Sequence, residues 1–223
     1  MRIRAAILLI LLTGLSVAQE PVKLTTEDGG IINAVVYGKG DRGVVLAHGG
    51  RFTKESWAKQ ARVLADAGFR VIAFDFRGFG ESRGPGQSDL YSAPVYWDVL
   101  AAVRYLDKTG AKTVSIVGAS FGGGAAGGAV CRVNPAEINR IVVLAAVPDC
   151  PPEKLRVPKL FIVARDDANS AGPRLPKIRE YYEKALEPKK LVIVDGSAHA
   201  QFLFDTDQGE RVLKEIVQFL SAP

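Results

Sequence analysis

Short apolar runs alternate with segments of helical periodicity from residue 43 onward, and this alternation constrains the fold more than any other feature. Short, mainly apolar runs of four or five residues are typical of strands that are buried on both faces. The expected strands are 44–47, 71–74, 114–117, 141–145, 160–164 and 191–194, and the expected helices are 55–67, 94–107, 121–133, 176–186 and 209–220. Strands separated by helices predict an α/β fold with a parallel, doubly wound sheet.

Two further extended runs precede this region. Residues 22–25 and 31–37 flank Asp28-Gly29-Gly30, a turn signal, so we expect an N-terminal antiparallel hairpin. Neither an internal repeat nor a low-complexity linker interrupts the pattern that follows. We therefore expect a single domain over residues 19–223.

The first 18 residues have the features of a secretory signal peptide. A short basic start that includes Arg2 and Arg4 is followed by an apolar run, 5–12, and by Ser16-Val17-Ala18, a small-x-small cleavage pattern. The apolar run is shorter than the ~20 residues that a bilayer requires. The sequence thus predicts a secreted or periplasmic protein that has no membrane association after cleavage.

The composition narrows the possible functions. The formal net charge is +5, from 29 Lys+Arg against 24 Asp+Glu, and the basic residues are scattered rather than gathered in a run. We therefore expect no nucleic-acid binding. Two cysteines and two histidines leave little room for a metal site, so no metal is expected. The chemistry assigned below to serine, histidine and aspartate side chains requires no organic cofactor either.

Ser120 is the predicted nucleophile. The expected strand 114–117 runs directly into Gly118-Ala119-Ser120-Phe121-Gly122, which leads into a helix, so the G-x-S-x-G pattern stands in a strand–turn–helix context. Such a sharp turn requires flanking residues without bulk, here Gly118 and Gly122. It also places the Phe121 N–H at a helix N-terminus, where it can stabilise a developing oxyanion.

A serine nucleophile requires a base, and only two histidines are available. His199 lies in a loop of small residues after the last expected strand, from which it can reach over the sheet. His48 also ends a strand, but Gly49-Gly50 follows it, which favours a role in shaping a backbone turn. We therefore assign the base to His199.

The acid is predicted from the residues after strand 160–164. Asp167 is favoured because a carboxylate clear of the strand end can turn inward, whereas Asp166 is expected to cap the loop. Asp149, which follows strand 141–145, is the alternative. Asp195 stands too close to His199 in the sequence to serve.

These motifs resemble those of the α/β-hydrolase family. The resemblance rests on Gly118–Gly122, on His48-Gly49-Gly50 and on Asp75-Phe76-Arg77-Gly78-Phe79-Gly80-Glu81-Ser82, and it covers about residues 22–221. It implies an oxyanion hole formed by the backbone N–H groups of Gly50 and Phe121, with Arg51 as the alternative to Gly50. It also implies that the 75–82 loop is structural.

The expected function is therefore that of a serine hydrolase, most simply a carboxylic-ester hydrolase with a small-molecule acyl substrate. Thioesterase or peptidase activity, or a binding protein without turnover, remain alternatives. Only residues 146–159, which are rich in proline, separate two of the expected strands, so we expect no cap domain. We expect an open cleft walled by 51–57, 81–91 and 168–175, with Arg51, Arg83 and Arg165 as candidates to meet an anionic substrate.

The two cysteines are expected to remain free thiols. Cys131 lies near the far end of the helix that follows Ser120, roughly 10 residues below the strand ends at a rise of about 1.5 Å per residue. Cys150 instead follows the carboxyl end of a strand, on the opposite rim of the sheet. A disulfide requires Cα atoms within about 7 Å of each other. The sequence does not indicate an oligomeric state.

Overall fold

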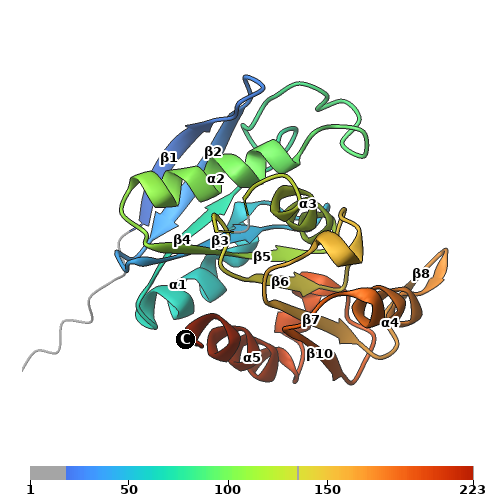
Figure 1. The fold of residues 1–223 in the computed structure, drawn as a ribbon. Coiled ribbons are helices and arrows are strands. Elements are labelled where there is room, and N and C mark those ends of the chain that lie inside the picture. Colours follow the sequence, from blue (N-terminus) through green and yellow to red (C-terminus); the bar gives the residue numbers. More distant parts are fainter. Residues whose placement is uncertain (1–18, 135, 223) are drawn as a thin grey trace, which may run out of the picture.

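The computed structural model describes residues 19–134 and 136–222. The expected signal peptide, residues 1–18, lies outside this part of the chain. The described residues form an eight-stranded sheet in the order β1-β2-β4-β3-β5-β6-β7-β10, flanked by helices on both faces (Figure 1). This confirms the expected single-domain α/β fold with a doubly wound, mostly parallel sheet.

The sheet consists of an antiparallel edge and a parallel centre. The antiparallel edge is the expected hairpin, β1 (Gln19–Thr25) and β2 (Ile31–Tyr37), and β2 also pairs antiparallel with β4. All other pairings are parallel. These strands are β3 (Arg42–Ala47), β4 (Phe69–Phe74), β5 (Thr113–Ala119), β6 (Ile141–Leu144), β7 (Lys159–Ala164) and β10 (Lys189–Val194).

Helices α1 (Ala58–Asp66) and α5 (Gly209–Ser221) lie on one face of the sheet, and α2 (Tyr96–Lys108) and α3 (Phe121–Val130) lie on the other (Figure 1). Helix α4 (Leu175–Lys184) joins the α3 face, where the Tyr181 hydroxyl donates to the Cys150 carbonyl, 2.9 Å away. Short elements complete the chain: the 3-10 helices η1 (Lys54–Trp57), η2 (Pro152–Lys154) and η3 (Ala200–Asp205), and the small strands β8 (Ala168–Asn169) and β9 (Gly172–Pro173).

The prediction of free thiols is wrong, because Cys131 and Cys150 form a disulfide with their Cα atoms 5.9 Å apart. The error lies in the course of the chain after β6. This segment does not stay at the rim of the sheet but descends along α3, where the Asp149 N–H donates to the Gly124 carbonyl at 3.0 Å. The close approach requires glycine in α3, since a Cβ on Gly127 would lie 2.2 Å from the Pro148 Cβ.

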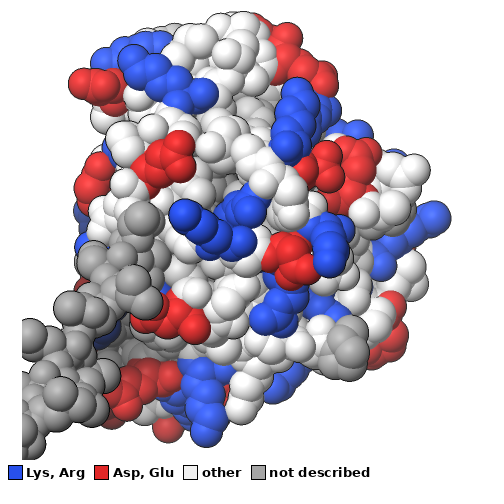
Figure 2. Space-filling model, turned by 90° about the vertical axis from the view of Figure 1, so that its left-hand side faces the viewer, with Lys and Arg blue, Asp and Glu red and all other residues white. Residues whose placement is uncertain are grey.

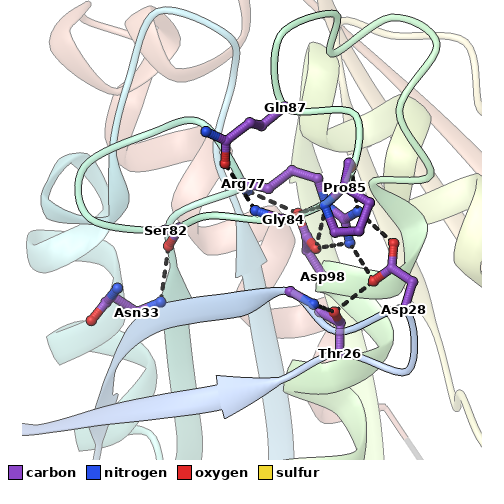
Figure 3. A network of polar contacts seen from close by, with 10 residues as sticks. Thr26, Asp28, Asn33, Arg77, Ser82, Gly84, Pro85, Gln87 and Asp98 are labelled. Carbon is purple, nitrogen blue, oxygen red and sulfur yellow. Dashed lines mark hydrogen bonds and ion pairs between the residues drawn. The ribbon is translucent and has the colours of Figure 1, made fainter.

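The loop between β4 and α2 contains the 75–82 motif, and its polar residues are bound to other elements. The Arg77 side chain is fully buried between Asp98 of α2 and Asp28 of the β1–β2 turn (Figure 3). Asp75 accepts from the Lys54 N–H and ammonium, both at 2.7 Å, and the Ser82 hydroxyl accepts from the Asn33 N–H at 2.9 Å. The motif therefore fastens the loop to three separate parts of the fold, as the resemblance implied.

Charged side chains of both signs are interspersed on the face seen in Figure 2, without a continuous tract of one sign among its described residues. Within residues 19–134 and 136–222, no helix is both long enough and apolar enough to cross a bilayer.

Candidate active site

Ser120 lies in the turn between β5 and α3, where its backbone is left-handed with φ 50° and ψ −116°. This conformation is strained for a residue with a side chain, and the close packing of α3 on the sheet maintains it. A Cβ on Gly118 would lie 2.4 Å from the Gly122 carbonyl oxygen, and a Cβ on Gly122 would lie 2.3 Å from that of Ala47. Both glycines are therefore required for the helix to begin where it does.

His199 lies in the loop after β10 and reaches Ser120 over the carboxyl ends of the strands. Its Nε2 is 2.8 Å from the Ser120 Oγ, and its Nδ1 is 2.8 Å from the Asp167 Oδ2. A carboxylate can only accept, so Nδ1 carries the proton and Nε2 is left to accept from the hydroxyl. This is the arrangement in which an imidazole can take a proton from serine.

Asp167 is buried after β7, whereas the other carboxylates weighed from the sequence lie elsewhere. Asp166 is exposed, and Asp195 pairs with Arg165 at 3.3 Å. Asp149 borders the cleft beside α3, where burial raises the pKa of its carboxyl. Of these four carboxylates, the structure brings only Asp167 within hydrogen-bonding distance of His199.

Arg174 is a neighbour of Asp167 that the sequence did not indicate. The Nε of its side chain lies 3.4 Å from Asp167 Oδ1, and its backbone N–H donates to the Asp167 backbone carbonyl at 2.9 Å. The guanidinium therefore places a positive charge beside the carboxylate that faces His199. The contact depends on the β8–β9 turn, which returns the chain toward the end of β7 and has no strong sequence signature.

Gly50 and Phe121, the expected oxyanion donors, border the same cleft as Ser120 and His199. A Cβ on Gly50 would lie 3.7 Å from the Phe121 Cβ, so the two residues are close neighbours. Arg51, the alternative donor, also borders the cleft. The loop after β3 and the turn between β5 and α3 thus bring the proposed backbone donors together beside Ser120.

His48 is fully buried under this loop and does not reach Ser120. Its Nδ1 donates to the Gly49 carbonyl at 2.8 Å, and its Nε2 accepts from the Phe76 N–H at 3.2 Å. Burial lowers the pKa of His48, and the Phe76 N–H leaves no room for a proton on Nε2. His48 therefore shapes the turn, as its position before two glycines suggested.

The cleft above Ser120 has a volume of about 940 Å³ and is lined mainly by apolar and aromatic side chains. Phe79, Leu90, Val95 and Phe202 contribute to its walls, and Arg51 and Arg174 are its positively charged side chains. Arg83 and Arg165, the other arginines considered from the sequence, do not line it. Between β6 and β7 the chain forms only the short helix η2, which places no helical cap over the opening.

Within the described residues, no cluster of three or more His, Cys, Asp or Glu side chains has an arrangement that could hold a metal ion.

The comparisons with known proteins agree with this fold. The family model described as alpha/beta hydrolase fold matches residues 43–204. The chain therefore belongs to the α/β-hydrolase family. A solved esterase of Pyrococcus furiosus has the same fold, with a TM-score of 0.75, 20% identity and 92% of each chain covered.

Curated relatives have several names. The chain is 36% identical over 190 residues to a non-heme chloroperoxidase of Streptomyces lividans, covering 83% of this chain and 58% of the relative. It is 39% identical over 80 residues to a bifunctional epoxide hydrolase of Sus scrofa, covering 36% of this chain and 14% of the relative. The chain thus spans little more than half the length of the first of these and a small part of the second. Together these names support a hydrolase of the α/β fold.

Proposed function

We propose that this protein is a serine hydrolase that acts on carboxylic esters through an acyl-enzyme intermediate. The observation that carries the proposal is the continuous hydrogen-bonded series Ser120–His199–Asp167, with both contacts at 2.8 Å. It lies at the floor of a largely apolar cleft that can receive an acyl chain. A binding protein without turnover would not require this alignment of three polar side chains.

In the proposed mechanism, the Ser120 Oγ attacks the acyl carbon while His199 Nε2 takes the hydroxyl proton. Asp167 holds the imidazole in the required tautomer and stabilises the imidazolium. The N–H groups of Gly50 and Phe121 stabilise the oxyanion, each by roughly 3–4 kcal/mol. His199 then protonates the departing alcohol, and water, deprotonated by His199, releases the acid.

The test is a panel of an aryl ester, a thioester and a peptide, assayed with the wild type and with Ser120→Ala. We expect ester hydrolysis by the wild type, a fluorophosphonate adduct on Ser120, and loss of both in the variant. Asp167→Asn replaces the carboxylate by a neutral amide, which neither fixes the tautomer of His199 nor stabilises the imidazolium, and should lower kcat by about 10³- to 10⁴-fold. Activity that survives Ser120→Ala would place the nucleophile elsewhere.

Asp166→Asn provides a matched control, since Asp166 is the adjacent carboxylate but is exposed. Its kcat should stay within about twofold of the wild type, because substitutions at solvated surface positions have little effect. Equal losses in Asp166→Asn and Asp167→Asn would contradict the assignment of the acid.

The names of the curated relatives favour a second candidate activity at the same site, halide peroxidation. If hydrogen peroxide replaces water as the nucleophile toward the acyl-enzyme, the product is a peracid, which can oxidise a halide. The test is halogenation of an organic acceptor in the presence of hydrogen peroxide, bromide and a carboxylic acid. Loss of that activity in Ser120→Ala would support it, and halogenation without the carboxylic acid would contradict this route.

A further inference from the structure

Gln201 connects the two loops that meet above Ser120. It follows His199 by two residues in the chain, is almost completely buried in η3, and accepts a hydrogen bond of 2.7 Å from the Gly49 N–H. Its Nε2 donates to the Ser56 Oγ at 2.6 Å. One side chain thus spans from the segment with the proposed base to the loop with a proposed oxyanion donor.

The orientation of the Gln201 amide is determined by these partners. A backbone N–H can only donate, so the atom facing Gly49 is the amide oxygen. The Ser56 hydroxyl donates its own proton to the Thr53 carbonyl at 2.6 Å, which leaves its oxygen to accept from the Gln201 Nε2. Each group in the series therefore has one consistent role.

Gln201 binds the N–H of Gly49, and the carbonyl of Gly49, which belongs to the Gly49–Gly50 peptide, is held as well. The Gly49 carbonyl accepts from the His48 Nδ1–H at 2.8 Å and from the Phe52 N–H at 3.0 Å. The Gly49–Gly50 peptide is trans, since among the described residues the cis peptide bond is that of Glu187–Pro188 alone. In a trans peptide the N–H points opposite to the carbonyl, so the Gly50 N–H is directed away from His48.

We propose that Gln201 is a positioning residue that keeps the Gly50 N–H directed toward the oxyanion. Two consecutive glycines have little intrinsic preference among backbone conformations, so hydrogen bonds must fix the turn. His48 and Phe52 hold one end of Gly49, and Gln201 holds the other. This inference rests on the proposed serine hydrolase function, for which an oxyanion is formed at this place.

The backbone of Ala200 provides an independent observation. Ala200 lies between His199 and Gln201, is buried, and has a left-handed φ of 51°. Such a conformation is strained for alanine and persists only where the surroundings enforce it. It lets adjacent side chains diverge, so that His199 reaches Ser120 while Gln201 reaches Gly49.

The test compares Gln201→Leu with the wild type on a matched pair of substrates, an aryl ester and its thionoester, in which sulfur replaces the carbonyl oxygen. Sulfur is a weak hydrogen-bond acceptor, so a loss of oxyanion donors should slow the ester more than the thionoester. We expect kcat for the ester to fall by about 10- to 100-fold, with KM changed less than about threefold. The ratio of ester to thionoester rates should fall by about 10-fold or more.

Two further variants complete the experiment. Gln208→Leu makes the same substitution at a half-buried glutamine before α5 and should leave both rates unchanged. Ser56→Ala removes the acceptor of the Gln201 Nε2, together with the bond that the Ser56 hydroxyl donates to the Thr53 carbonyl, and leaves Gln201 itself in place. It therefore provides a measurement even if Gln201→Leu does not fold. It should lower the ester kcat by about 3- to 10-fold and also lower the rate ratio.

A Gln201→Leu kcat within twofold of the wild type would overturn the proposal, as would an equal loss on both substrates, which indicates a general structural defect. An unchanged rate ratio in Ser56→Ala would also overturn it. Failure of the proposed function is distinguishable, because it appears in the wild type: an absence of ester hydrolysis and of fluorophosphonate labelling removes both proposals. Failure of the Gln201 role alone leaves the wild type active and Ser120→Ala inactive.

Discussion

The two histidines have opposite environments, and these environments separate their roles. His199 is partly exposed in the cleft and bonded to Ser120 and Asp167, whereas His48 is buried between backbone groups and the rings of Phe76 and Phe79. The Phe76 N–H donates to His48 Nε2, so that nitrogen must stay unprotonated. A second proton on His48 would place a donor against a donor inside the core.

This contact predicts an acid-sensitive contribution to stability. Burial lowers the pKa of His48 below its ordinary value of 6.5, so the unfolded chain binds the proton first as the pH falls. The contribution of His48 is complete above pH 6.5 and is lost by up to about 1.4 kcal/mol per pH unit below it, until the folded pKa is reached. Compared with His48→Asn, the wild type should therefore lose its advantage in unfolding free energy between pH 7.5 and pH 5, as measured by urea denaturation. A constant difference between the two proteins would show that His48 titrates normally in the fold.

The residues of the candidate site were predictable where their position follows from topology. Ser120, Asp167 and His199 each follow a strand of the parallel part of the sheet, and the carboxyl ends of parallel strands meet at one edge of the sheet. Gln201 and Arg174 were not predictable, because their partners depend on how loops fold after the strands end. Gly49 and Gln201 are 152 residues apart in the sequence, and no local pattern indicates their contact.

At the scale of elements, the strands were predicted more accurately than the segments between them. Buried apolar runs have a direct sequence signature, whereas the first turn of the expected helix 55–67 is the 3-10 helix η1, and the expected helix 121–133 ends at Val130. The part of the chain between β6 and η2 has no regular structure to predict. The sequence predicts a path along the rim of the sheet, whereas the glycines of α3 allow this segment to pack along the helix.

The disulfide at the end of that path should contribute to stability. Cys131 and Cys150 are 19 residues apart, and closing a loop of this length stabilises a fold by about 3 kcal/mol through the entropy of the unfolded chain. The double variant Cys131→Ser/Cys150→Ser should unfold at a lower urea concentration than the oxidised wild type. Dithiothreitol should destabilise the wild type by a similar amount and leave the double variant unchanged. Two titratable thiols in the unfolded, unreduced wild type would contradict the bridge.

At the scale of the whole molecule, the antiparallel edge is joined to the rest of the fold by Arg77. Its guanidinium donates to Asp98 on α2 at 2.7 and 2.9 Å, and to Asp28 in the β1–β2 turn (Figure 3). Burial raises the pKa of Asp98. At Asp28 burial also acts to raise the pKa, but the hydrogen bonds from Arg77 and Thr26 and the charge of Arg77 together outweigh it and lower the pKa. Because the Asp28 side chain is partly exposed and the Asp98 side chain is not, water can replace Arg77 as a partner of Asp28 more readily than as a partner of Asp98.

This difference predicts unequal effects of removing each acid. The Asp98 side chain is fully buried, so Asp98→Ala leaves Arg77 without its buried partner and should lower the free energy of unfolding by about 3–5 kcal/mol. The Asp28 side chain is 19% exposed, so Asp28→Ala should cost less, about 1–2 kcal/mol, because water can reach the guanidinium from that side. Asp107→Ala, at an exposed position on the same helix α2, is the matched control and should stay within about 0.5 kcal/mol of the wild type. Urea denaturation of the three variants measures these differences. Equal losses for Asp98→Ala and Asp28→Ala would show that burial does not determine the strength of this connection, and the hairpin would then be held by its strand pairing with β4.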